Sequence, residues 1–71
     1  MEFEHATEER LAREAAADRL RALADDLARQ NEISFVRDGK RFTIAVPSEV
    51  TFEVEIEMGD EGTELEIEVR W

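Results

Sequence analysis

The stretch that decides the fold reads Val50-Thr51-Phe52-Glu53-Val54-Glu55-Ile56-Glu57-Met58-Gly59-Asp60-Glu61-Gly62-Thr63-Glu64-Leu65-Glu66-Ile67-Glu68-Val69-Arg70-Trp71. Its charged and apolar residues alternate, which is typical of strands with one apolar and one polar face. A turn at residues 59–62 folds the two alternating runs into a hairpin. Its register places Val54 opposite Ile67 on the apolar face, with Val50 opposite Trp71 at the end.

The polar face of this predicted hairpin carries facing pairs of glutamates. Its members, called the acidic face below, are Glu53, Glu55, Glu57, Glu64, Glu66 and Glu68. Like charges directly opposite one another destabilise a sheet, so the ladder calls for an explanation. Three remain open: a solvated surface adapted to concentrated salt, a docking face for a basic protein, and oxygen ligands for calcium or magnesium. A flat ladder converges poorly on a metal ion, and Asp60, Glu61 and Thr63 at the turn form a second loop candidate.

Two shorter strands are predicted before this hairpin. Asp38-Gly39 lies between alternating runs at residues 33–36 and 41–46, and Asp-Gly there is a strong hairpin signal. The resulting register pairs Phe35 with Phe42. A tight connection at residues 47–49 would then place Ile44 opposite Phe52 and Arg41 opposite Glu55, which makes one continuous meander.

A long helix is expected over residues 8–29, with Thr7 as its N-cap. Glu9–Arg13 and Asp25–Arg29 have the spacing of favourable helical ion pairs. Its apolar stripe at helical spacing consists of Ala12, Ala16, Leu20, Leu23, Ala24 and Leu27.

Together these elements predict a two-layer α+β domain with the order β-α-β-β-β-β. Phe3 and His5 suggest a short first strand. The three helix leucines are expected to pack on an antiparallel meander sheet of four to five strands. Trp71 is expected to close one end of that core.

Composition restricts the function classes. The chain has 71 residues, no cysteine and a net charge of −10, from 19 acidic and 9 basic residues. A single domain is therefore expected, and phosphate backbones and anionic membranes should be repelled. No signal peptide or apolar span is recognisable, which favours a cytoplasmic protein. We expect a monomer in dilute buffer, with weak homodimers in high salt, and a basic protein as the partner class.

Catalytic motifs are absent from the sequence. His5 is the sole histidine, and no nucleophile is placed beside it. Ser34 and Ser48 have no base assigned to them by spacing, and the three glycines do not form a phosphate-binding loop. The sequence therefore predicts a non-enzymatic protein without a cofactor.

Several segments together resemble the amphi-Trp domain family. They are Glu14-Ala15-Ala16-Ala17, Leu23-Ala24-Asp25-Asp26-Leu27, Val46-Pro47, Phe52-Glu53-Val54-Glu55-Ile56-Glu57 and Leu65-Glu66-Ile67-Glu68-Val69-Arg70-Trp71. The family is named for amphipathic C-terminal strands that end near a tryptophan, and it is frequent in halophilic microbes. The resemblance implies this fold and halophilic adaptation of the surface, but no established activity. We therefore expect a small acidic domain with a binding or assembly role, with cation binding by the ladder as the alternative.

Overall fold

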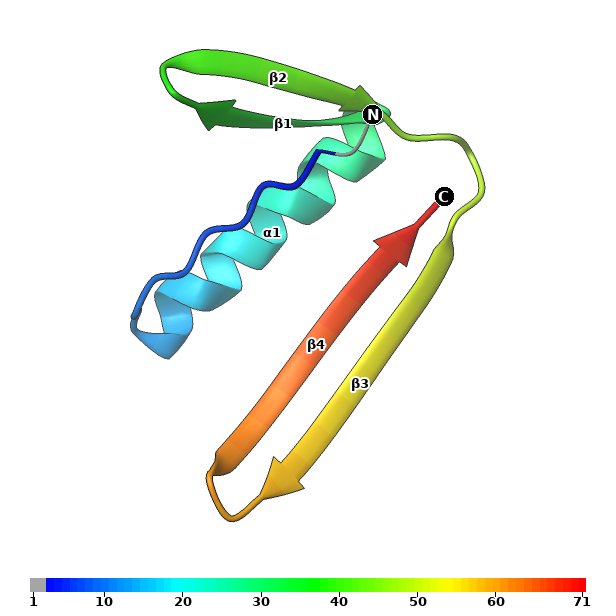
Figure 1. Ribbon diagram of the computed structural model, residues 1–71. Coiled ribbons are helices and arrows are strands. Elements are labelled where there is room, and N and C mark those ends of the chain that lie inside the picture. The colour runs from blue at the N-terminus through cyan, green and yellow to red at the C-terminus, as the bar shows by residue number, and fades with distance from the viewer. Residues whose placement is uncertain (1–2) are drawn as a thin grey trace.

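The computed structural model describes residues 3–71 and has an α+β architecture (Figure 1). One helix is followed by four antiparallel strands. The elements are α1 (Arg13–Arg29), β1 (Glu32–Arg37), β2 (Lys40–Ala45), β3 (Thr51–Gly59) and β4 (Gly62–Arg70). No helix in this part of the chain is long and apolar enough to cross a membrane.

Both predicted hairpins are confirmed in their registers. Phe35 lies opposite Phe42 in the first, and Val54 lies opposite Ile67 in the second. Asp38 and Gly39 have φ values of 53° and 75°. Two successive positive φ values are what a two-residue type I′ turn requires. Local turn chemistry therefore sets the register of the first hairpin.

The predicted continuous meander is not what the structure shows, because the strands form two separate two-stranded sheets, β1–β2 and β3–β4. Ile44 is not paired with Phe52, and Arg41 is not paired with Glu55. The β2 strand ends at Ala45 and β3 begins only at Thr51. Pro47 lies between them and has no N–H to donate to a ladder. The connection leads β3 away from β2 (Figure 1).

The helix begins at Arg13, later than residue 8, and its N-cap is Ala12 without a side-chain hydrogen bond. Thr7 is therefore not the N-cap. The segment before the helix lies along α1 instead (Figure 1), and Glu9 accepts two hydrogen bonds from the Arg19 guanidinium at 3.2 and 3.0 Å. This pairing replaces the expected Glu9–Arg13 pair. The chain leaves the helix at Asn31, whose φ is 55°. Asparagine tolerates this left-handed conformation, which is common just after a helix.

The N-terminal segment carries no strand in residues 3–12, contrary to the expected first strand. Its aromatic side chains nevertheless lie on the β1–β2 hairpin. The His5 ring stacks on Phe35 with 4.5 Å between centroids, and Phe3 lies 5.8 Å from Phe35 and 5.5 Å from Phe42. The Arg37 guanidinium lies 4.9 Å from the Phe3 ring and donates to the Glu4 carbonyl. Aromatic packing thus fastens this segment without a ladder.

Residues 3–71 contain no fully buried side chain. Leu27 is half-buried, but Leu20 and Leu23 remain exposed. Within the described residues, no Cα atom of α1 lies within 8 Å of a Cα atom of β3 or β4. The expected packing of the helix leucines on Phe52, Val54, Ile67 and Val69 is therefore not made. Trp71 is 54% exposed and closes no core.

Candidate functional site: the acidic face of the C-terminal hairpin

The β3–β4 hairpin brings the six predicted glutamates together on one face. The register pairs Glu53 with Glu68, Glu55 with Glu66, and Glu57 with Glu64. Successive pairs lie two residues apart along each strand, so they share a face. Directly opposite side chains in such a ladder have Cβ atoms about 4.5–5.5 Å apart, close enough for carboxylates to repel one another. The predicted acidic face is therefore present as a continuous double row.

The positively charged side chain of Arg70 lies at one end of this double row. The Arg70 guanidinium donates to the Glu68 carboxylate at 2.8 Å and lies 3.9 Å from that of Glu53. It therefore bridges the two members of one facing pair. Charge-assisted hydrogen bonds from guanidinium to carboxylate are among the stronger polar contacts in proteins. The ladder is thus able to receive a guanidinium group between opposed carboxylates.

The middle of the ladder lacks such a cation. Among the described residues, no arginine or lysine forms a salt bridge with Glu55, Glu57, Glu64 or Glu66. The pKa of Glu66 is raised above its ordinary value, chiefly by the negative charge of Glu64 and next by that of Glu55. The side chain is open to solvent, so like charge is the dominant cause. Electrostatic repulsion is therefore concentrated around Glu66.

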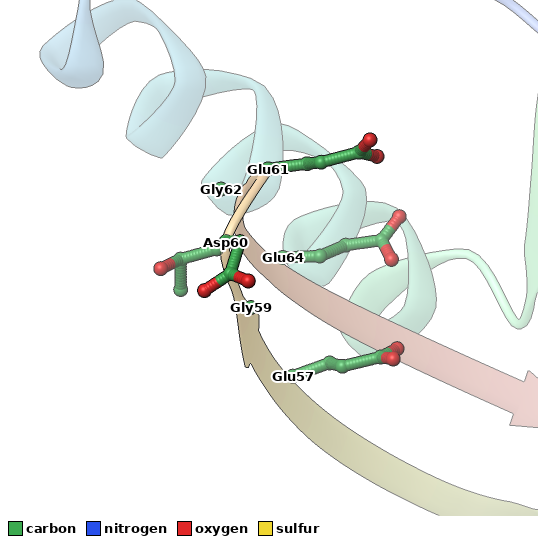
Figure 2. A pocket seen from close by; sticks show the side chains of 7 residues that line it. Glu57, Gly59, Asp60, Glu61, Gly62 and Glu64 are labelled. Atoms are coloured by element: carbon green, nitrogen blue, oxygen red, sulfur yellow. The ribbon is translucent and has the colours of Figure 1, made fainter.

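The turn end of the hairpin holds a shallow, open depression. It is lined by Glu57, Gly59, Asp60, Glu61, Gly62, Thr63 and Glu64. Figure 2 shows Glu57, Glu61 and Glu64 extending toward the same side, while Asp60 projects in another direction. Glu61 thereby extends the acidic face beyond the strands. In the loop candidate made of Asp60, Glu61 and Thr63, the carboxylates of Asp60 and Glu61 therefore do not point at one centre (Figure 2).

Metal binding finds no convergent ligand set in residues 3–71. Within that range, no group of three or more histidine, cysteine, aspartate or glutamate side chains is arranged to hold a metal ion. The flat ladder explains this, because its carboxylates project side by side. Calcium instead takes six to eight oxygen ligands around one point.

All six glutamates of the acidic face are predicted by the sequence, but the cation beside them is not Arg41. Arg41 was expected opposite Glu55, yet it lies on β2 opposite Val36. Arg70 supplies the positive charge. Its position could have been found from the sequence, because it continues the odd–even alternation of Glu64, Glu66 and Glu68 and so falls on the same face.

The opposite face of this hairpin is apolar and uncovered. Phe52 is 65% exposed and Ile56 is 66% exposed. The other exposed members of this apolar face are Val54, Met58, Leu65 and Ile67. Exposed apolar faces of this kind mark interaction sites in soluble proteins. The hairpin therefore offers two surfaces of opposite chemistry.

Comparison with known proteins gives a family and nothing finer. The model of the Amphi-Trp domain matches residues 1–71, which is the whole chain. No curated protein and no solved structure matches it.

Proposed function

The chain belongs to the Amphi-Trp domain family, and from this premise and the hairpin geometry we propose that it is a non-enzymatic binding domain whose acidic face docks a basic protein segment. The observation that carries the proposal is the bridge from Arg70 to Glu68 and Glu53. A guanidinium on the chain itself already lies between two opposed carboxylates. A partner's arginines would continue the same arrangement along the ladder.

The free energy for docking comes from repulsion that a partner removes. The Glu55–Glu66 and Glu57–Glu64 pairs are like-charged neighbours, and the raised pKa of Glu66 reports their mutual repulsion. A guanidinium placed between them replaces repulsion with charge-assisted hydrogen bonds. Arginine fits better than lysine, because its planar fork can bond two carboxylate oxygens at once. The preferred partner is therefore an arginine-rich, extended segment.

Salt adaptation of the surface is compatible with this proposal. A net charge of −10 keeps the chain soluble at salt concentrations that screen the charges of less strongly charged proteins. Screening also weakens attraction for a basic partner, since the Debye length falls from about 10 Å at 0.1 M salt to about 3 Å at 1 M. Binding in concentrated salt would then depend on close, hydrogen-bonded contacts more than on long-range attraction. We place the domain in the cytoplasm as part of the same proposal.

The test is titration calorimetry with an arginine-rich peptide and with a lysine peptide of equal charge. The arginine peptide should bind the wild-type chain more tightly. The double variant Glu55→Gln with Glu66→Gln should weaken that binding about fivefold, because two exposed charge contacts contribute roughly 1 kcal/mol together.

A matched control separates the ladder from net charge. The control double variant, Glu4→Gln with Glu8→Gln, also removes two negative charges, but from the exposed N-terminal segment. It should leave the arginine-peptide affinity nearly unchanged. Equal weakening by both double variants would mean that only net charge matters, which contradicts a docking face. Saturable calcium binding at constant ionic strength, abolished by the first double variant alone, would favour the cation-binding alternative.

A further inference from the structure

The chain exposes far more surface than a compact protein of its size. Its accessible surface is 6920 Å², whereas a folded monomer of 8.2 kDa is expected to expose about 4,500 Å². The Cα radius of gyration is 14.1 Å, against about 11 Å for a compact chain of this length. About 2,400 Å² per chain is therefore left to be covered.

Both parts of the chain contribute to this excess. The apolar face of the β3–β4 hairpin is open, and so are Leu20 and Leu23 on α1 and Ile44 on β2. A hollow between the N-terminal segment, α1 and the β1–β2 hairpin is lined by Phe3, Leu23, Ile33, Phe35 and Ile44, among others. A cover for one part alone would leave the other exposed. The two surfaces have the same apolar chemistry.

We propose that two copies of this chain exchange their C-terminal hairpins, so that the apolar face of each β3–β4 hairpin covers α1 and the β1–β2 hairpin of the other copy. This goes beyond the docking function, because it uses the opposite face of the hairpin. Burying about 2,400 Å² on each chain gives a total near 4,800 Å², within the roughly 2,000–5,000 Å² of obligate homodimers. The exchange is reciprocal, so the assembly closes with two-fold symmetry.

Strand geometry favours a second copy as the occupant. A two-stranded hairpin is marginal alone in water, and each hairpin here has unpaired edges. The alternation of β2 and β3 suits pairing with Ile44 opposite Phe52. The connection at residues 46–50 carries β3 away from its own β2 (Figure 1). The same pairing is then available between copies.

Charge permits this association despite the net charge of −10 per chain. All six glutamates of the acidic face lie opposite the hairpin face that would be covered. They would stay in solvent on the outside of the dimer. Dimerisation should therefore strengthen as salt screens the remaining repulsion. This replaces the expectation of only weak dimers with a specific interface.

Disulfide trapping tests whether the hairpin is covered by its own chain or by a second copy. The test is clean because the chain has no cysteine of its own. Thr43→Cys and Glu53→Cys would face each other if β2 and β3 pair in the inferred register. The chain carrying both substitutions should form a covalent dimer upon oxidation in about 1 M potassium chloride. Each singly substituted chain is the control and should stay uncrosslinked. A disulfide within one chain would show that the hairpin folds back on its own chain, and would overturn the proposal.

Sedimentation equilibrium supplies an independent test with matched variants. Val54→Thr places a hydroxyl in the proposed interface, and Thr51→Val makes the reverse isosteric change on the acidic face of the same strand, which would stay in solvent. Val54 is 52% exposed and Thr51 is also open to solvent in the single chain, so neither change should unfold it. Val54→Thr should raise the dimer dissociation constant about tenfold or more, and Thr51→Val should leave it within about twofold. A monomer throughout, or equal effects of both variants, would overturn the exchange.

Discussion

At the scale of single residues, Glu66 concentrates the electrostatic strain of the molecule. Its pKa is raised by Glu64 first and Glu55 next. A carboxyl whose pKa is raised on folding binds its proton more tightly in the folded chain. Its contribution therefore stabilises the folded chain below the raised pKa and is lost as the pH rises through it. At neutral pH the charged Glu66 weakens the fold.

Removing that charge should stabilise the protein. We expect Glu66→Gln to raise the melting temperature at pH 7 in low salt, and to do so less in about 1 M salt, where the repulsion is screened. Glu8→Gln removes one charge from a segment outside the ladder and should change the melting temperature little. Lowering the pH from 7 toward the raised pKa of Glu66 should stabilise the wild-type chain more than the Glu66→Gln variant. Equal behaviour of both variants would contradict repulsion within the ladder.

At the scale of elements, the two hairpins depend on backbone conformations that few residues adopt. Gly39 has φ +75°, and no atom lies within 4 Å of a Cβ added there. The space is open, so only the backbone conformation opposes a side chain. Gly59 is equally open but does not have a positive φ of this kind. Because neither site has a steric conflict, comparing the two glycines isolates conformational strain.

Substituting these glycines gives a direct comparison. Gly39→Ala should destabilise the chain by about 1–2 kcal/mol, the cost of a left-handed conformation for an L-residue. Gly59→Ala should be nearly neutral or slightly stabilising, because it restricts the unfolded chain without straining the folded one. Urea unfolding measures both changes. Equal losses for the two substitutions would mean that the β1–β2 turn does not hold the conformation described here.

The elements also show what the sequence was able to predict. Both hairpin registers follow from Asp38-Gly39 and from the alternation around residues 59–62, because neighbouring residues decide them. The predicted β2–β3 pairing within one chain is wrong, because it depends on the path of residues 46–50. The sequence also predicts too early a start for α1, since Glu9 pairs with Arg19 across ten positions and not with Arg13 on a further helical turn. Such non-local contacts leave no mark in local periodicity.

At the scale of the whole molecule, the C-terminal hairpin separates two chemistries. One face carries the acidic ladder with Arg70 at its end, and the other carries exposed apolar side chains. The sequence predicted both faces through their period of two. It did not predict that the apolar face is left uncovered, because covering it requires a partner surface. Assembly on one face and docking on the other are therefore compatible in one small domain.

If the ladder docks cationic side chains, its open carboxylate pairs repel one another in the free chain and lose that repulsion in the complex. Carboxyl-detected nuclear magnetic resonance titration of Glu66 tests this most directly. In the free chain at low salt, the pKa of Glu66 should lie above the ordinary value of a glutamate, chiefly because Glu64 and then Glu55 oppose its charge. Saturation with an arginine-rich peptide should move the Glu66 midpoint down. A Glu66 midpoint at the ordinary glutamate value in the free chain, or one unmoved by the peptide, would contradict the account.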